Sequence, residues 1–275
     1  MTGLKWTKKT TEKIADELAR AGMVVSARTV GRLLVKMNFS LKTCRKNIEA
    51  GRTNKPGNRK RRDQQFRKVK RLRQQFEQAG LPVISVDSKK KEKVGNFKND
   101  GKTWREEPRE VFDHDFPSNA KGKAIPYGIY DTQKNKALVV VGTSSETPEF
   151  AVEAVEEWVC LPERQTDYKS AKQLMILADC GGGNGYRSTV WKRDIQEKLC
   201  NRHGIAVTVC HYPPGASKWN PVEHRLFSPI SRNWAGVPLD SYETVLNYIA
   251  TTTTKTGLKV KAILNEKIYL KGQSA

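Results

Sequence analysis

Two short apolar runs that each end in an aspartate constrain the fold more than any other feature of the chain. Val83–Asp87 and Leu174–Asp179 have the length and composition of buried strands. A third acid, Glu223, follows Pro221 by two residues, and proline favours the first turn of a helix. Because two strand ends and a helix start can converge at one edge of a sheet, we expect these three carboxylates to share a site.

Three carboxylates at one site indicate a metal-dependent reaction on a phosphodiester. Mg²⁺ and Mn²⁺ prefer oxygen ligands, and three acids can hold two ions about 3.5–4 Å apart, at the attacking and leaving oxygens. Taken singly, either aspartate could cap a neighbouring helix or pair with a lysine. The ordered set favours metal ligation, so Asp87, Asp179 and Glu223 are predicted to be the catalytic residues and the ligands of two Mg²⁺ or Mn²⁺ ions.

The basic charge of the chain predicts a polyanionic partner. Its 275 residues carry a formal charge of +21, and residues 1–80 hold 22 Lys and Arg against 6 Asp and Glu. The longest strand-like apolar run, Ala137–Val141, is far shorter than the roughly 20 residues that cross a bilayer. No secretory signal opens the chain. We therefore expect DNA as the partner, no membrane association and a soluble, cytoplasmic protein.

The five cysteines indicate neither a disulfide framework nor a zinc site. They are odd in number and dispersed, which is typical of a protein from a reducing compartment. A zinc site could be built only from Cys200, His203, Cys210 and His211, which lack the paired spacing of a zinc finger. Ordinary buried thiols are the expected state.

Residues 1–41 predict a small helical domain of the helix-turn-helix type. Apolar residues at helical spacing over 11–21 end at Gly22, and Ser26 can cap a second helix. The apolar side of that helix would consist of Val30, Leu33, Leu34 and Met37. Near its start, where base edges are usually contacted, the outward-facing residues would be Arg28, Thr29 and Arg32. A plain helical hairpin is the alternative, because two helices alone do not show which groove they enter.

Residues 42–80 predict a basic linker followed by a connector helix. Basic residues are dense there and peak at Arg59, Lys60, Arg61 and Arg62. A solvated linker and a segment that contacts phosphates are compatible interpretations, because flexible Lys and Arg bind the DNA backbone without reading its sequence. An amphipathic helix leading into the next domain is indicated by the spacing of Phe66, Val69, Leu72 and Phe76.

Residues 81–275 predict one α/β domain with a mixed sheet flanked by helices. Strands come first, over 83–87, 92–97 as its hairpin partner, 124–130 and 137–142. A helix over 147–160 follows. The order then alternates through a strand over 173–178, a helix near 187–203, a strand over 205–210, and helices near 221–233 and 241–250. A meander followed by alternation is typical of a mixed sheet covered by helices.

Several blocks in this order resemble the Rhodopirellula-type DDE transposases of bacterial insertion sequences. They are Ile84-Ser85-Val86-Asp87 with Lys89-Lys90-Lys91-Glu92, Val94-Gly95-Asn96-Phe97, His114-Asp115-Phe116-Pro117, Pro126-Tyr127-Gly128, Ala178-Asp179 with Gly182-Gly183-Asn184-Gly185-Tyr186-Arg187, and Ser217-Lys218-Trp219-Asn220-Pro221-Val222-Glu223-His224-Arg225. The last block also resembles the Asn-Pro-x-Glu block of mariner-like transposases. The resemblance runs from about Trp6 to about Gly272.

The resemblance implies an RNase H-like catalytic fold in which Asp87, Asp179 and Glu223 form the acidic triad. It implies an enzyme that cleaves double-stranded DNA at the terminal repeats of its element and joins the freed 3′-hydroxyl to target DNA. A homo-oligomer assembled on DNA and a nucleoid-associated location in a bacterium are expected with it. The short stretch before the first helix suggests a DNA-binding domain that is incomplete at its N-terminus.

Residues around the acids are predicted to support them or to contact phosphate. Asn220 could position the helix of Glu223 or a phosphate, and Asn184 lies in the glycine run that follows Asp179. This run lacks the Lys-Ser/Thr of a phosphate-binding P-loop and the dinucleotide pattern. We interpret it as a tight turn beside Asp179, with a flexible surface loop as the alternative. Further phosphate contacts are predicted at Arg187, Lys218 and Arg225.

Two other functions stay open from the sequence. One is a non-catalytic DNA-binding protein, either a decayed or a domesticated derivative of a transposase. The other is a simple RNase H-like nuclease that cleaves DNA without rejoining it. The presence of all three acids favours catalysis, and strand-transfer products separate the transposase from the nuclease.

Overall fold

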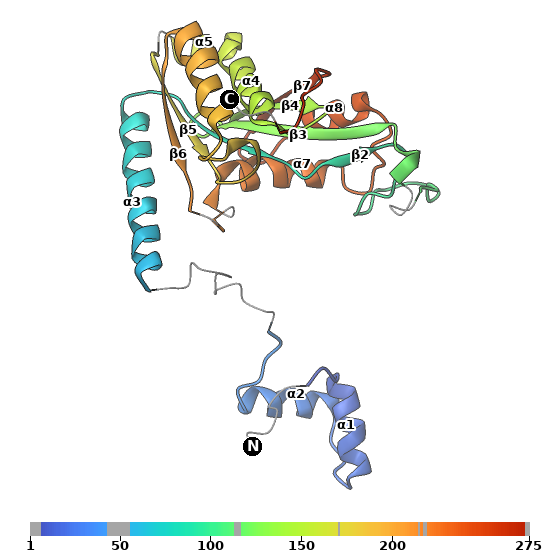
Figure 1. The fold of residues 1–275 in the computed structure, drawn as a ribbon. Helices are drawn as coiled ribbons and strands as arrows, with labels where there is room; N and C mark the ends of the chain where they lie inside the picture. Colours follow the sequence, from blue (N-terminus) through green and yellow to red (C-terminus); the bar gives the residue numbers. More distant parts are fainter. Residues whose placement is uncertain are drawn as a thin grey trace. The chain divides into compact units, whose positions relative to one another are not determined.

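The protein comprises two compact units, Met1–Gly51 and Arg52–Ala275, which are considered separately (Figure 1). The computed structural model describes residues 7–42, 56–112, 117–169, 171–213, 215–216 and 219–272. Within these ranges, no helix combines the length and the apolar composition needed to cross a bilayer. The roles assigned to residues 1–41, 42–80 and 81–275 remain predictions.

The first unit contains the two predicted helices, α1 (Thr11–Arg20) and α2 (Ala27–Lys36). Ser26 caps α2 by accepting a hydrogen bond from the backbone N–H of Thr29 at 3.2 Å. Of the predicted apolar side, only Val30 is buried, whereas Leu33 is 44% and Met37 58% exposed. The expected apolar face of α2 is therefore wrong for Leu33 and Met37, because two ten-residue helices enclose too little volume between them to cover both.

The second unit begins with the connector helix α3 (Pro56–Gln78). Val69 and Phe76 of this helix are buried against the sheet, together with Val83, Met175 and Leu177. Burial of its apolar side confirms the predicted amphipathic helix and makes it part of the sheet domain. Lys60 and Arg61 are exposed on its outer side, and the guanidinium of Arg62 lies 5.6 Å from the ring centre of Phe66.

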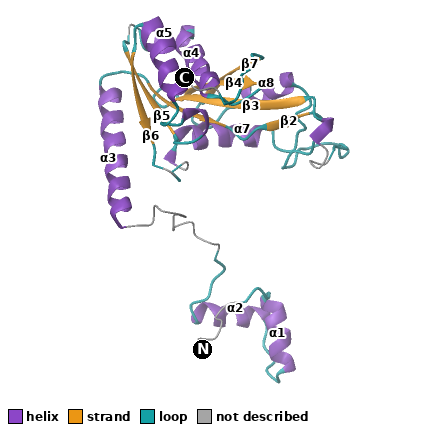
Figure 2. Ribbon diagram, viewed as in Figure 1, coloured by secondary structure: helices purple, strands orange, loops and turns teal. Residues whose placement is uncertain are grey.

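Seven strands form one mixed sheet in the order β6-β5-β1-β3-β4-β7, with β2 paired to β3 outside this path (Figure 2). β1 and β4 flank β3 in antiparallel pairs, and the remaining pairs on the path are parallel. The strands are β1 (Val83–Ser88), β2 (Glu92–Val94), β3 (Gly122–Asp131), β4 (Lys136–Gly142), β5 (Gln173–Ala178), β6 (Ala206–His211) and β7 (Lys259–Asn265).

Helices cover both faces of the sheet. On one face lie α4 (Pro148–Cys160) and α6 (Thr189–Asp194), the latter continued by the π-helix η4 (Ile195–Asn201). The other face carries α3 and the helices η6 (Glu223–Phe227), α7 (Ser228–Asn233) and α8 (Tyr242–Ala250). The remaining short helices are η2 (Pro117–Asn119), α5 (Pro162–Asp167) and η3 (Gly182–Asn184).

Burial on two faces explains why the strands read as continuous apolar runs. Ile84 and Val86 of β1 pack with Phe150 and Val155 of α4, whereas the alternate residue Val83 packs on α3. Neighbouring side chains of a strand point to opposite faces, so a strand covered on both sides needs apolar residues at every position. The predicted α/β architecture, a mixed sheet flanked by helices, is confirmed.

Three elements differ from the sequence prediction. The segment 92–97 does not form a hairpin with β1, because β2 pairs with β3 through Glu92 opposite Ala124. β3 is ten residues long and extends beyond β1, which leaves its outer end to pair with β2. Helix α5 and strand β7 were not predicted. β7 alternates lysine with apolar residues only at its start, over Lys259–Ala262. Its partner strand is distant in the chain, since Lys259 pairs with Lys136 of β4, 123 residues earlier.

Candidate active site

Asp87, near the end of β1, and Asp179, directly after β5, occupy equivalent positions on two neighbouring parallel strands. The ladder between β1 and β5 pairs Val83 with Met175 and Ser85 with Leu177, an offset of 92 residues. Asp87 and Asp179 are separated by the same 92 residues, so the offset carried two positions further sets them opposite one another. Side chains alternate along a strand, and both aspartates therefore point to the face that carries η6.

Asn220 fastens the start of the third element to β1. Its side-chain oxygen accepts a hydrogen bond from the hydroxyl of Ser85 at 2.5 Å, and its amide donates to Oδ2 of Asp87 at 3.2 Å. The same hydroxyl of Ser85 accepts from the backbone N–H of Val222 at 3.1 Å. Ser85 and Asn220 are fully buried. These bonds hold the helix start, and with it Glu223, against the end of β1.

The pKa of Asp87 is affected by both of the other acids. Burial is the largest cause that raises the pKa of Asp87, and together with the negative charges of Asp179 and Glu223 it brings this pKa to about 7. The backbone N–H of Ser88, which donates to Oδ1 at 2.8 Å, and the Asn220 amide oppose the rise in this pKa. Asp87 is thus a buried carboxylate whose ionised form lacks sufficient compensating positive charge in the protein.

The glycine run after Asp179 forms a tight, partly buried turn. Residues 182–184 make a single turn of 3-10 helix in which Gly183 and Asn184 are buried. Gly182 has φ +56°, and a Cβ on Gly183 would approach the carbonyl oxygen of Thr147 to 2.9 Å. Glycine is therefore required here for backbone conformation and for close approach to the start of α4. The predicted tight turn fits this geometry better than the alternative of a flexible surface loop.

Asn184 links the turn to β3 and β6. Its side-chain oxygen accepts a hydrogen bond from the hydroxyl of Tyr127 at 2.6 Å, and its backbone oxygen lies 2.7 Å from Nε2 of His211. Burial raises the pKa of Tyr127, and the charges of Asp87 and Asp179 add to the shift. Tyr127 therefore stays a neutral hydrogen-bond donor that fixes the turn against β3.

Asp87 and Asp179 line one open cavity together with basic residues. Lys89, Lys90, Lys91 and Glu146 also border it. Lys91 pairs with Glu146 at 3.3 Å, and Lys89 pairs with Glu92 at 2.7 Å. Lys90 is exposed at the rim. A second cavity shares Asp179 and Gly181 with the first and is bordered by Arg187.

The other predicted contact residues fall into three groups. Arg225 lies outside the acid-lined cavities and borders a different groove of the same domain, and its predicted contact with phosphate stays a prediction. It faces away because it lies on the other side of the helix from Glu223. Arg28, Thr29 and Arg32 are exposed on α2, as expected for a contact surface. Lys218 and the side chain of Arg59 lie outside the described residues.

Three supporting residues were missed from the sequence: Ser85, Tyr127 and Glu146. Ser85 is a polar residue inside an apolar strand, and it shares one face of the strand with Asp87, two residues later. This pattern is the signal that could have identified it. Tyr127 resembles an ordinary core residue in the sequence. Glu146 directly precedes Thr147, which caps α4 by accepting a hydrogen bond from the backbone N–H of Phe150. Recognition of this cap in the sequence could have placed Glu146 at the end of the connection between β4 and α4.

The donor set at the ends of β1 and β5 fits a divalent cation. Oδ1 of Asp179 is buried without a hydrogen-bond partner in the described structure, and Asp87 is a buried carboxylate beside it. Such oxygens are the preferred ligands of Mg²⁺ and Mn²⁺. Among the residues that the structure describes, no three Asp, Glu, His or Cys side chains are arranged closely enough to form a complete ligand cluster. The two aspartates therefore offer oxygen ligands for a cation. The helix that begins at Glu223 is held next to β1, but the three carboxylates do not form a complete ligand cluster.

Comparison with solved structures shows a shared fold. The Mos1 transposase paired-end complex with the left transposon end superposes with a TM-score of 0.53 at 13% identity, over 88% of this chain and 65% of that chain. The Mos1 mariner paired-end complex with Mn gives a TM-score of 0.51 at 15% identity and the same coverage. The chain therefore spans 65% of the length of these neighbours. The fold is therefore similar to that of the Mos1 transposase.

The family follows from the sequence of the whole chain. The profile of the Rhodopirellula transposase DDE domain matches residues 1–275. The protein belongs to this family, which confirms the resemblance described above. No curated protein sequence matches the chain.

Proposed function

We propose that the protein is a DNA transposase that uses Asp87, Asp179 and Glu223 to cleave the ends of its element and to join them to target DNA. The observation that carries the proposal is the shared register of Asp87 and Asp179, with Asn220 connecting Asp87 to the helix of Glu223. Family membership supports a transposase. The geometry supports the assignment of the three acids as its catalytic residues.

The three carboxylates would hold divalent cations, and we propose two Mg²⁺ or Mn²⁺ ions. Bound in this way, divalent ions activate the attacking oxygen and stabilise the leaving oxygen of a phosphodiester. The structure of a Mos1 complex with Mn and the carboxylate chemistry support this choice. Asp87 and Asp179 supply oxygens from a rigid sheet, and the Asn220 amide keeps Oδ2 of Asp87 in a fixed orientation.

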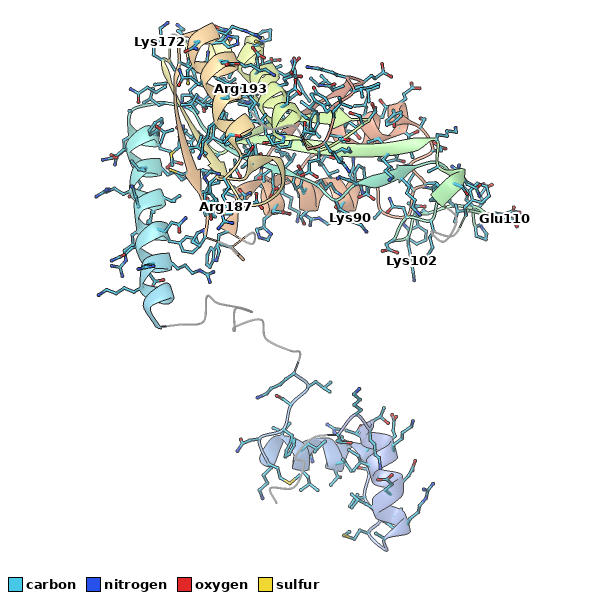
Figure 3. All side chains as sticks on the ribbon, in the orientation of Figure 1. Lys90, Lys102, Glu110, Lys172, Arg187 and Arg193 are labelled. Carbon is cyan, nitrogen blue, oxygen red and sulfur yellow. The ribbon has the colours of Figure 1, made fainter. Side chains whose placement is uncertain are left out.

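Basic residues on both sides of the acids would hold the DNA strand. Figure 3 places Arg187 and Lys90 on the same side of the sheet domain, whereas Lys172 lies at the opposite end of β5. Arg187 and Lys90 border the two cavities that share Asp179. Positive charges there would position the phosphodiester backbone without reading sequence. Arg187 is stacked at 5.4 Å over the Tyr186 ring, which limits its freedom of movement.

End recognition is proposed for the first unit. Arg28, Thr29 and Arg32 lie exposed near the start of α2, the position from which a helix-turn-helix contacts base edges. The hydroxyl of Thr29 lies 2.9 Å from that of Ser26, so part of its hydrogen-bonding capacity serves the helix cap. We further propose that subunits assemble as homo-oligomers on the terminal repeats, since joining two ends calls for at least two active sites, and that the protein works at the bacterial nucleoid.

The test is incubation of the purified protein with the terminal repeats of its element, a target plasmid and Mn²⁺, followed by sequencing of the products. A transposase gives junctions between the 3′ ends of the element and target DNA. Cleaved ends without junctions would show a simple nuclease. Binding without cleavage would show a non-catalytic derivative, and either of these outcomes would refute the proposal.

A further inference from the structure

A basic groove lies at the other end of β1 from the acids. Two adjoining cavities form it and share Asn135, His224, Arg225 and Thr256. The backbone N–H of Thr132, at one wall, donates to the carbonyl oxygen of Val83 at the start of β1. Asp87 is four residues further along the strand, which corresponds to about 13 Å at the rise of a β-strand. The groove shares no lining residue with the two cavities that contain Asp179.

The charges on this groove are not neutralised within the described structure. Arg225, Arg232 and Lys255 line it and are exposed, and none of the three side chains forms a hydrogen bond or ion pair with a described residue. No acidic side chain contributes to the described lining of either cavity. Arg73, at one end, is paired with Glu77 at 2.7 Å and adds less to the net charge.

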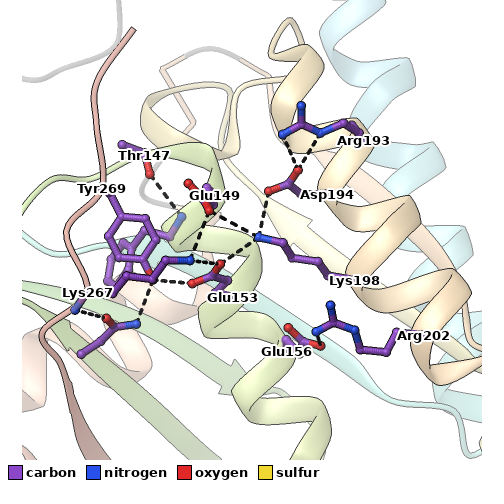
Figure 4. Close-up of polar contacts among 12 residues, drawn as sticks. Thr147, Glu149, Glu153, Glu156, Arg193, Asp194, Lys198, Arg202, Lys267 and Tyr269 are labelled. Carbon is purple, nitrogen blue, oxygen red and sulfur yellow. Dashed lines mark hydrogen bonds and ion pairs between the residues drawn. The ribbon is translucent and has the colours of Figure 1, made fainter. Parts of the chain in front are cut away.

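Basic residues on the opposite face of the domain behave differently. Figure 4 shows Lys198, Arg202 and Lys267 in contact with carboxylates of α4 and α6. Lys198 lies 2.8 Å from Glu153, and Arg202 lies 2.8 Å from Glu156. On this face, the positive charges of Lys198, Arg202 and Lys267 are therefore neutralised by neighbouring carboxylates. The groove is a place where several cations converge without such compensation, which is typical of a surface for an anionic partner.

The walls of the groove are held at a fixed spacing by hydrogen bonds. Asn135 accepts from the Tyr130 hydroxyl at 3.0 Å and donates from its side-chain amide to the carbonyl oxygen of Thr256 at 2.9 Å. These bonds tie the turn between β3 and β4 to the loop before β7. Thr254 and Thr256 bring hydroxyl groups to the same wall, with their oxygens 2.9 Å apart. Hydroxyls and amides beside cations are the usual donors to phosphate oxygens.

We propose that this groove, defined by Arg225, Arg232, Lys255 and the Thr254–Thr256 wall, binds the phosphate backbone of a DNA duplex away from the acidic site. The elongated form of two joined cavities and the spread of three cations fit a polyanion better than a single phosphate. The groove would hold a DNA segment that is not being cut, so that one domain contacts duplex at two places. The proposal shares with the proposed function only the nature of the ligand.

The test compares full-length variants in EDTA, where no cleavage takes place. Affinity for a random-sequence duplex of roughly 30 base pairs is measured by fluorescence anisotropy between about 50 and 200 mM NaCl. Arg232→Gln combined with Lys255→Gln removes two groove charges. If both contact phosphate, the slope of log K against log salt becomes shallower by about 1.8, and the ratio of Kd values between the two salt concentrations falls about tenfold.

Two further variants make the result specific. Lys172→Gln with Lys192→Gln removes two exposed lysines elsewhere in the domain and should change the slope by less than about 0.5. Arg232→Lys with Lys255→Arg keeps the charge and should retain the wild-type slope. An unchanged slope in the groove variant, or an equal change in the Lys172 and Lys192 control, would overturn the proposal. A chain that never cleaves DNA but shows the groove-specific slope would refute the catalytic function and still support the groove.

Discussion

The side-chain amide of Asn220 donates a hydrogen bond to Oδ2 of Asp87 over 3.2 Å, although 133 residues separate the two in the chain. This contact joins the first acid to the element that carries the third. Asn220 also receives the hydroxyl hydrogen of Ser85, so a buried polar chain runs from β1 into the helix start. A fully satisfied network of this kind fixes one geometry, since the loss of any member leaves a buried polar group unpaired.

Asn220→Ala is expected to lower the rate of DNA cleavage about 10- to 100-fold, because supporting residues of a metal site typically have effects of this size. The amide lowers the pKa of Asp87, so its loss should also shift the pH–rate profile to higher pH. Asn99→Ala, which removes bonds to the carbonyl oxygens of Trp234 and Val237, is the control for general destabilisation. A similar pH shift in the control would contradict a positioning role.

We expect cleavage to fall by at least about 10³-fold in each of Asp87→Asn, Asp179→Asn and Glu223→Gln. When residues act as a unit, the loss of one costs about as much activity as the loss of all. Binding to duplex DNA in EDTA should survive, because it depends on Lys and Arg. Gel-based cleavage and anisotropy measure the two properties separately. Asp100→Asn, an exposed acid of the same domain, should cleave like the wild type. Wild-type cleavage by any of the three variants would remove that residue from the site.

The stability of the metal-free protein should fall as pH rises from about 4 to about 7. Asp87 has a folded-state pKa of about 7 against an ordinary value of 3.8, so the folded state binds the extra proton in this window. At pH 8 in EDTA, the free energy of unfolding of Asp87→Asn should therefore exceed that of the wild type by about 1–3 kcal/mol, and the variant should unfold at a higher urea concentration. Urea titrations at several pH values test the sign. A less stable variant in EDTA would contradict the electrostatic strain inferred for Asp87.

Deletion of residues 1–55 should leave a folded sheet domain, whereas deletion of residues 1–80 should not. The second deletion removes α3 and exposes Val83, Met175 and Leu177, which are fully buried. Loss of two buried side chains of the size of Val69 and Phe76 costs several kcal/mol, at about 2–4 kcal/mol each. Thermal melts followed by circular dichroism distinguish the two deletion variants. Equal melting temperatures would show that α3 does not stabilise the sheet.

The bonds to Glu153 should make part of the stability sensitive to acid. Burial alone would raise the pKa of Glu153, but bonds from Lys198, Lys267 and Tyr269 outweigh it and lower this pKa to about 2. Its contribution is therefore complete above about pH 4.5 and is lost as pH falls towards 2. Glu153→Gln should flatten stability over that range, whereas the exposed Glu157→Gln should not. Urea midpoints between pH 5 and pH 2 give the comparison.

The sequence predicted the parts of the site that depend on local pattern. An apolar run closed by an acid identifies a strand end, and proline before Glu223 identifies a helix start, because both signals reside in adjacent residues. The partner of segment 92–97 could not be obtained in this way. Its pairing with β3 instead of β1 depends on the length by which β3 extends past β1, which is a property of the assembled sheet.

Long-range polar contacts were equally hidden. Ser85 and Asn220 are separated by 135 residues, and nothing in either neighbourhood specifies the other. The surroundings of Arg225 were hidden for a related reason. Arg225 follows Glu223 by two residues in the π-helix η6, which directs the two side chains to different sides of the helix and leaves Arg225 at the basic groove. The membership of α3 in the sheet domain likewise required the packing partners of Val69 and Phe76.

Strand β7 completes the outer edge beyond β4, and Tyr269 just after it packs against Phe150 of α4 at 5.3 Å between ring centres. During synthesis, β4 leaves the ribosome more than a hundred codons before its partner does. Until then its seven residues present an open edge that invites pairing with other chains. A frameshift in the codons for Lys259–Asn265 would make that exposure permanent, so mutations late in the gene should cause its product to aggregate while the codons for Asp87, Asp179 and Glu223 are intact.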